Sequence, residues 1–436
     1  MKEQKDFKLF FRYVSLNIIS MAGLSFYILA DTFFVANGIG ARGLASLNLA
    51  IPIFSFITGT GMMLGIGGGT GFAIMKARNR SDEAEKIFMN MFYGAAAFSA
   101  VAFLSGIFIP GEIAVLLGAD VNTMEMTETY IRIILLFSPA FMLNDLLNCF
   151  IKNDGNPRAA MMAMVAGSLV NIVFDYIFIF QLGMGMKGAA LATGSAPVVG
   201  ILILSFHFIQ KKNTFTMRKV KPEFRFYRSF VPLGVPSLVN ELSSGIVIIV
   251  FNLLILNFVG NTGVAAYGII ANISLVVIAI YTGIAQGIQP VLSEAYGKGL
   301  QKRIRNILRY GMITSLLISS IICFFLMTGT DQVISFFNHE ENIQLAAIAK
   351  GGIRIYFTAM PFAGINIVLC SFFASTEEKL PAHIISLSRG FILILPLVVI
   401  MSGIMGLTGI WMSFPVTELI TAVFGIICFY RKQHRA

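Results

Sequence analysis

Five acidic residues lie inside stretches of sequence that are otherwise apolar, and they are the first candidates for chemistry. A carboxylate inside a bilayer costs about 3 kcal/mol on insertion scales, so membrane proteins seldom keep one without a partner or a function. Asp31 and Asp175 each lie about 16 residues into an apolar stretch, which places the two carboxylates at a similar depth. They could therefore meet. The five acids are Asp31, Asp145, Asp175, Glu241 and Glu418.

Two further polar residues accompany Asp31 and Asp175. Asn171 precedes Asp175 by one helical turn and shares its helix face, and Thr193 lies on the next apolar stretch. Two neighbouring carboxyls titrate as a pair and can hold a proton, while carboxylate, amide and hydroxyl oxygens can equally ligate a sodium ion. A third alternative is that these side chains only join two helices through hydrogen bonds. The residue types leave the three alternatives open.

Three other charged residues inside apolar stretches are weaker candidates. Asp145 and Glu418 are expected to have structural roles. Arg389 is expected to extend its charge towards the membrane surface or to pair with a neighbouring group, and a role in a cavity stays open.

The segments that must position these residues are membrane spans. Of the 436 residues 56% are hydrophobic and only 12% are charged, with a mean hydropathy of +0.80, which excludes an ordinary soluble protein. The fold class expected is an all-α integral membrane protein, since each apolar run is long enough to cross the bilayer as a helix. Twelve spans are predicted, at 15–37, 43–75, 87–109, 123–150, 159–180, 188–210, 229–257, 263–296, 310–328, 344–374, 382–403 and 409–430.

The distribution of Lys and Arg predicts the orientation of the chain. The two ends and the alternate loops hold 26 of the 32 basic residues, and the opposite loops hold five. By the positive-inside rule both termini are expected in the cytoplasm, with the chain in the cytoplasmic (inner) membrane. The same asymmetry explains the net charge of +10, so no nucleic-acid partner is expected.

The two halves of the sequence repeat one another. A shift of 220 residues brings "NGIGARGLA" (37–45) onto "NFVGNTGVA" (257–265), and a shift of 222 brings "IRIILLFSP" (131–139) onto "IRIYFTAMP" (353–361). We expect an N-lobe at 1–210, a linker at 211–228 and a C-lobe at 229–436. Six spans per half give both lobes one orientation, and such a parallel repeat is typical of secondary transporters.

Several motifs resemble those of the multidrug and toxic compound extrusion (MATE) transporters over nearly the whole chain. They are "YILADTFFV", "KNDGNPRAAMMAMV", "NIVFDYIFIF" followed by "MGMKGAALAT", and "GVPSLVNELSSG". The resemblance implies twelve helices in two six-helix lobes. It also implies a cation site formed by Asp31, Asn171, Asp175 and Thr193, with Asn148 beside them.

The chain departs from the family pattern at two places. Many relatives have a proline about fifteen residues before the aspartate of the first helix, where this chain has Leu16, so a proline hinge is not expected. Sodium-coupled relatives pair a glutamate of the seventh helix with an aspartate of the tenth; Glu241 resembles the glutamate, but "YFTAMPFAGINIVLCSFF" holds no acid. Glu241 is therefore expected to be a counter-charge for a cationic substrate or a hydrogen-bonding partner between helices.

The function expected from this resemblance is export of amphipathic, mainly cationic compounds in exchange for H⁺ or Na⁺. No cofactor, enzymatic activity or metal beyond a possible sodium ion is expected, and the protein is expected to be a monomer. One alternative is a flippase for a lipid-linked or polysaccharide precursor, although the intramembrane charges here are mostly acidic. An alternative of another class is a membrane-embedded enzyme, which is disfavoured because no nucleophile–base pair lies at one depth.

Overall fold

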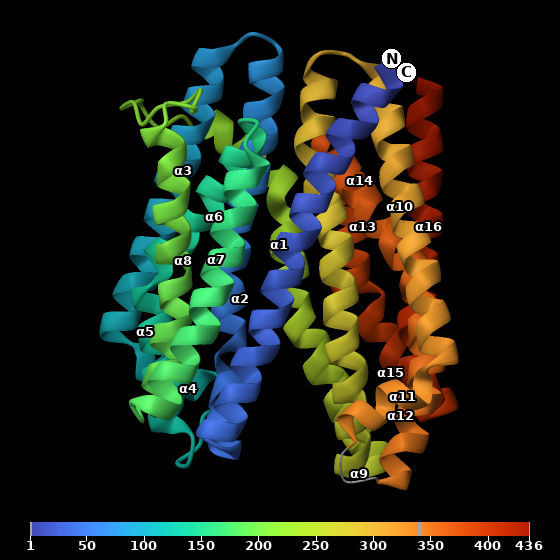
Figure 1. The fold of residues 1–436 in the computed structure, drawn as a ribbon. Coiled ribbons are helices and arrows are strands. Elements are labelled where there is room, and N and C mark those ends of the chain that lie inside the picture. The colour runs from blue at the N-terminus through green and yellow to red at the C-terminus, as the bar shows by residue number, and fades with distance from the viewer. Residues whose placement is uncertain (1, 339–341, 436) are drawn as a thin grey trace. The chain divides into compact units, whose positions relative to one another are not determined.

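The computed structural model describes residues 2–338 and 342–435, which are helical almost throughout (Figure 1). Contacts within the chain define two compact units. The N-unit comprises Ser15–Leu242 with Ser293–Gln301, and the C-unit comprises Met1–Val14, Ser243–Leu292 and Lys302–Ala436. The first residues of the chain thus group with the C-unit, and residues 211–242 group with the N-unit. The lobe boundaries predicted above stay a prediction.

The helices of the N-unit follow one another with short connections. Helical backbone satisfies its own hydrogen bonds, which lipid cannot do. The helices are α1 (Lys2–Gly38), α2 (Ala41–Ala77), α3 (Ser81–Phe108), the short α4 (Pro110–Leu116), α5 (Met124–Leu136), α6 (Ser138–Asn153), α7 (Pro157–Asp175), the π-helical turn η1 (Tyr176–Gln181) and α8 (Gly185–Ile209).

The second half of the chain begins with a long helical segment that is two helices in one. Gly260 interrupts it with a backbone φ of 68°, a left-handed conformation that glycine adopts at little cost. The elements are α9 (Phe224–Gly297), α10 (Gln301–Thr328), the short α11 (Thr330–Phe337), α12 (Ile343–Tyr356), η2 (Phe357–Ala359), α13 (Met360–Ser375), α14 (Lys379–Leu387), the π-helical turn η3 (Ser388–Ile392), α15 (Ile394–Met405) and α16 (Leu407–Arg435).

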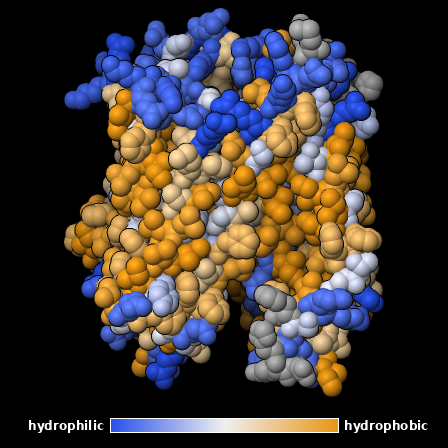
Figure 2. All heavy atoms as spheres, in the orientation of Figure 1, coloured by the Kyte–Doolittle hydropathy of each residue, from blue (hydrophilic) through white to orange (hydrophobic). Residues whose placement is uncertain are grey.

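The described residues confirm a multi-pass membrane protein with twelve spans. Ten helices are long and apolar enough to cross a bilayer, and α5 with α6 forms one more span, bent by 48°. Dividing α9 at Gly260 brings the number to twelve. In Figure 2 hydrophobic side chains cover the middle of the helices and hydrophilic ones gather at their ends.

The joints between helices repeat as the sequence repeats. Gly40 (φ 90°) separates α1 from α2, and Gly260 (φ 68°), 220 residues later, divides α9. Pro139 and Pro361 each lie in the first turn of a helix that follows a break, α6 and α13 respectively. The short helices α4 and α11, which the hydropathy pattern does not predict, follow the third span of each half.

Candidate functional site

Asp31 of α1 and Asp175 at the end of α7 meet inside the N-unit. Both side chains are buried, and their carboxyl groups lie close enough to interact directly. Two neighbouring carboxyls in a low-dielectric interior titrate as a pair and can share a proton. Within the described residues, Oδ1 of each aspartate is buried without a hydrogen-bond partner, so the pair can accept a further donor or a cation.

Asn171 connects this pair to α8. With its amide nitrogen towards Asp175, Asn171 donates to Asp175 Oδ2 over 3.2 Å, and its oxygen accepts from the Thr193 backbone N–H over 3.2 Å. The opposite orientation would give only a weak contact of 3.5 Å between Nδ2 and Thr193 Oγ1, so the first orientation is favoured. The structure therefore brings four of the predicted residues into one cluster: Asp31, Asn171, Asp175 and Thr193.

Aromatic residues hold α1 against the helix that carries Asp175. Phe34, one turn after Asp31, lies with its ring 6.4 Å from that of Tyr176 and 5.9 Å from that of Phe180. Tyr176 and Phe180 belong to η1, which begins directly after Asp175. A π-helical turn is uncommon and often occurs at functional sites. Here it shifts the register of the aromatic residues that face α1.

Two tyrosines near the cluster were not predicted from the sequence. Tyr130 on α5 is buried close to Thr193. Thr193 Oγ1 itself donates to the Ala189 carbonyl over 3.1 Å, so its oxygen can still accept from a neighbouring hydroxyl. Tyr27 lies on α1, one turn before Asp31. A tyrosine inside a span signals a hydroxyl that needs a partner, and that signal could have identified Tyr130.

Asn148 contacts the backbone of α7 and not the carboxyl pair. Its Nδ2 donates to the Ala160 carbonyl over 3.1 Å, and the side chain is buried. This contact braces α6 against the helix that carries Asn171 and Asp175. Its predicted place in a cation site stays a prediction.

Glu241 and Asp145 approach α2 at two glycines. A Cβ atom added to Gly59 would lie 3.1 Å from Glu241 Cβ, and one added to Gly61 would lie 3.0 Å from Asp145 Oδ2. The absence of side chains at these positions is what lets α9 and α6 pack so closely on α2. No hydrogen-bond partner for Asp145 Oδ2 is found within the described part of the chain.

The predicted spans 123–150 and 159–180 leave Lys152 in the basic loop between them, and the structure differs there. The hydropathy pattern places it in a cytoplasmic loop, but it belongs to the last turn of α6 and is 4% exposed. Its Nζ donates to Asn17 Oδ1 on α1 over 3.3 Å. The prediction was wrong because a helix can extend past its apolar run when a polar partner receives the charged end.

Glu418 and Arg389 pair with each other inside the C-unit. Arg389 Nε lies 2.9 Å from both Glu418 oxygens, so the arginine pairs locally, one of the alternatives expected for it. In the described residues, no three His, Cys, Asp or Glu side chains gather to hold a metal ion.

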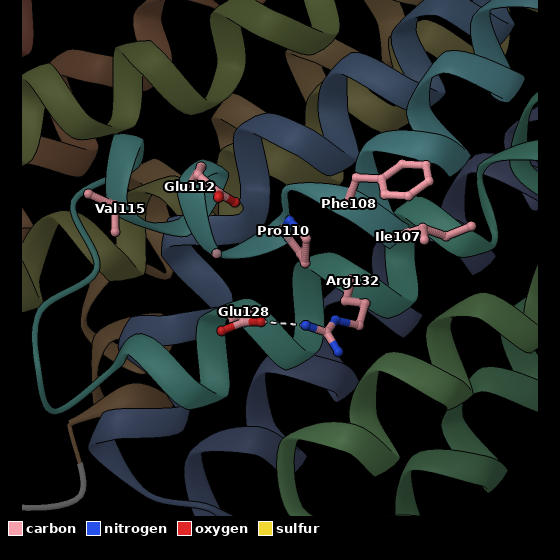
Figure 3. Close-up of a pocket in the computed structure, with 8 residues that line it drawn as sticks. Ile107, Phe108, Pro110, Glu112, Val115, Glu128 and Arg132 are labelled. Carbon is pink, nitrogen blue, oxygen red and sulfur yellow. Dashed lines mark hydrogen bonds and ion pairs between the residues drawn. The ribbon is translucent and has the colours of Figure 1, made fainter.

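An open pocket of about 560 Å³ lies between the end of α3, α4 and α5 (Figure 3), and neither Asp31 nor Asp175 lines it. Arg132 and Glu128 form an ion pair of 2.5 Å on its wall, and Phe108 lies exposed at its edge. Its charged side chains lie partly in solvent, so it is a shallower and wetter site than the buried cluster. We take the cluster as the candidate functional site.

Known proteins of similar sequence are exporters. The multidrug export protein MepA of Staphylococcus saprophyticus is 27% identical over 413 residues, covering 94% of this chain and 90% of that protein. The MepA of Staphylococcus aureus strain MRSA252 is 24% identical over 416 residues with the same coverage.

Solved structures of similar fold are MATE transporters. A MATE in complex with MaL6 superposes with a TM-score of 0.91 at 23% identity, covering 98% of this chain and 96% of that one. The MATE multidrug transporter DinF-BH gives a TM-score of 0.88 at 27% identity, with 97% of this chain and 95% of that one covered. The MatE family model matches residues 17–177 and again residues 236–400, once in each half of the sequence repeat. The chain therefore belongs to the MATE family, and it is a transporter and not an enzyme.

Proposed function

We propose that this protein is a multidrug exporter that exchanges amphipathic, mainly cationic compounds for an inward-moving cation across the cytoplasmic membrane. Relatives that cover 94% of the chain are named multidrug export proteins. The single observation that carries cation coupling is the buried Asp31–Asp175 pair, in which two carboxylate oxygens have no partner among the described residues. Transporters of this family need no cofactor.

The proposed cycle uses the charge of the cluster. An entering cation neutralises the pair, which changes the hydrogen bonds between α1, α7 and α8 and favours the state that releases the compound outside. Each charge that moves inward through the membrane field gains about 2.3 kcal/mol per 100 mV. Loss of the cation to the cytoplasm restores the charged pair and resets the transporter.

A proton is the favoured coupling ion, because Asp31 and Asp175 are buried neighbours and two such carboxyls readily hold a proton between them. Sodium stays the second candidate, because Asp31, Asn171, Asp175 and Thr193 together offer carboxylate, amide and hydroxyl oxygens. Asn148 is proposed to keep α6 and α7 aligned around this site.

Substrate binding and topology complete the proposal. Glu241 is proposed as a counter-charge for cationic substrates. We further propose a monomer with both termini in the cytoplasm and two six-helix lobes, in agreement with the position of the basic loops.

The experiment that tests this function is transport in proteoliposomes with proton and sodium gradients imposed separately. A gradient that drives uptake of a cationic dye identifies the coupling ion. If neither gradient drives transport, the coupling proposal fails. Movement of labelled lipid-linked precursors without dye transport would favour the flippase alternative.

A further inference from the structure

Three polar side chains inside the C-unit form a second buried cluster. Arg389 Nε donates to both oxygens of Glu418 over 2.9 Å. Asn366 Nδ2 donates to Glu418 Oε2 over 2.7 Å and to the Glu418 backbone carbonyl over 2.8 Å. The cluster therefore joins α13, η3 and α16.

The hydrogen bonds of this cluster are incomplete. A guanidinium carries five N–H donors, and only the Nε of Arg389 is engaged by a described residue. Asn366 is fully buried, and its Oδ1 also lacks a partner in the described chain. Buried polar groups that serve stability alone are normally satisfied. Nη1 and Nη2 of the partly exposed Arg389 are therefore open to a further partner.

The depth of Arg389 in its span bears on where its terminal nitrogens lie. The side chain is 11% exposed, and it lies ten residues into the span Lys379–Met405. Charged side chains at such depth turn towards the bundle interior or a water-filled space. Arg389 also lies in the π-helical turn η3, just as Asp175 directly precedes η1 in the first half. The fifth span of each half thus carries one charged residue at a π-helical turn, an acid in the first half and a base in the second.

We propose that Arg389 binds the carboxylate group of transported compounds, with Nη1 and Nη2 each donating to one carboxylate oxygen. Glu418 and Asn366 hold the guanidinium through its Nε side and leave the two-nitrogen edge free for this bidentate contact. The inference rests on the proposed transport function and deepens it. The substrates then include amphipathic compounds that carry a carboxylate as well as a cationic group.

The neutral charge of the Arg389–Glu418 pair favours amphipathic zwitterions over small free anions as ligands. Because Glu418 already neutralises Arg389, a small free anion gains little from entering this site. An amphipathic zwitterion gains hydrophobic contacts in addition to the two hydrogen bonds. We therefore expect the site to distinguish a zwitterion from its ester and not to bind simple salts.

The test compares a rhodamine dye that has a free benzoic acid with the ethyl ester of the same dye. Binding of each to the purified full-length protein is measured by fluorescence anisotropy. The wild-type protein should bind the acid more tightly than the ester. Arg389→Lys keeps a positive charge beside Glu418 but lacks the two-nitrogen edge, so the preference for the acid should fall about tenfold. The matched control is Arg354→Lys, at an exposed position on α12, which should keep the wild-type preference.

A second variant keeps the inference testable if Arg389→Lys does not fold. Arg389→Gln with Glu418→Gln removes both charges together and should lose the same preference. The inference is overturned if the wild-type protein does not prefer the acid, or if a folded variant keeps the wild-type preference. It is also overturned if a variant loses binding of the acid and of the ester equally. Failure of the wild-type protein to transport the ester in proteoliposomes would instead refute the proposed transport function, and the binding ratio would still decide the role of Arg389.

Discussion

His207 Nε2 lies 2.9 Å from Asp154 Oδ2, and this contact ties the end of α8 to the loop between α6 and α7. The neighbours of His207 determine which ring nitrogen carries the proton. Asn156 Oδ1 accepts from the Ala159 backbone N–H over 3.3 Å, so its Nδ2 is the atom that faces His207 Nδ1 at 3.1 Å. Nδ1 must then accept, and the Nε2–H donates to Asp154.

The Asp154 carboxylate accepts hydrogen bonds from three more donors at this end of the N-unit. Lys76 Nζ lies 2.6 Å from its Oδ1, and Thr214 donates through its hydroxyl and, over 2.9 Å, through its backbone N–H. Burial raises the pKa of the Asp154 carboxyl, but the hydrogen bonds from His207, Lys76 and Thr214 outweigh it and lower the pKa below its usual 3.8. One ionised carboxylate therefore joins α2, α8 and the segment after α8.

The first prediction is that Asp154→Asn destabilises the protein by about 3 kcal/mol at pH 7, because it leaves Lys76 and His207 without their buried partner. The folded pKa is depressed, so the stabilisation is complete above about pH 4 and is lost as the pH falls through the folded pKa. Thermal unfolding in detergent from pH 8 to pH 3 measures both effects. Asp82→Asn, at the exposed start of α3, is the control and should change little. If the difference in melting temperature between the variant and the wild type stays constant down to pH 3, the stabilisation does not depend on the ionised Asp154 carboxylate.

The joints of the fold could be predicted from the sequence because they depend on local residue types. Gly40 and Gly260 match at a shift of 220 residues, and both adopt a positive φ. The similar depth of Asp31 and Asp175 could also be predicted, since it needs only the rise per residue of two helices that run in the same direction.

The pairing of side chains across helices could not be predicted. Arg389 and Glu418 meet because their helices are rotated about their axes in a particular way, and packing against several neighbours sets that rotation. Lys152 was placed in a loop for a related reason, since its partner Asn17 lies 135 residues earlier in the chain. Hydropathy carries no information about either contact.

The second prediction concerns topology. A cysteine in place of Lys219, exposed in the segment after α8, should not react with an impermeant thiol reagent added outside intact cells, because the basic loops are expected in the cytoplasm. A cysteine in place of Val121, 98% exposed in the loop after α4, should react from outside. Both are made in a chain without Cys149, Cys323, Cys370 and Cys428. The reverse labelling pattern would overturn the orientation.

The third prediction concerns Glu241. If its carboxylate balances the charge of cationic substrates, Glu241→Gln should lower export of a cationic dye about tenfold and export of a neutral compound much less. Efflux from cells expressing each variant at equal levels provides the measurement. Glu112→Gln, an exposed glutamate on the wall of the pocket in Figure 3, is the matched control. Equal losses for both compounds would show that Glu241 only joins helices.

The last prediction concerns the carboxyl pair. Asp175→Asn keeps the size of the side chain and its contact with Asn171 while removing the group that takes up the cation. The variant should insert and bind substrate, but its gradient-driven transport in proteoliposomes should fall by at least about tenfold. Asp31→Asn should behave in the same way. Because the two carboxyls lie side by side, we expect them to act on one ion, and the double variant should be little worse than either single one.

The alternative, in which the pair only joins α1 to α7, predicts a different pattern. Removing one carboxyl would then lower the melting temperature and the expression level, and the protein that remained would still couple transport to the gradient. Measuring the melting temperature, substrate binding and gradient-driven uptake on the same preparation separates the two patterns. Normal uptake by well-folded Asp175→Asn protein would remove the ion site from this account, whereas loss of uptake with unchanged melting temperature and substrate binding would place the coupling ion at Asp31 and Asp175.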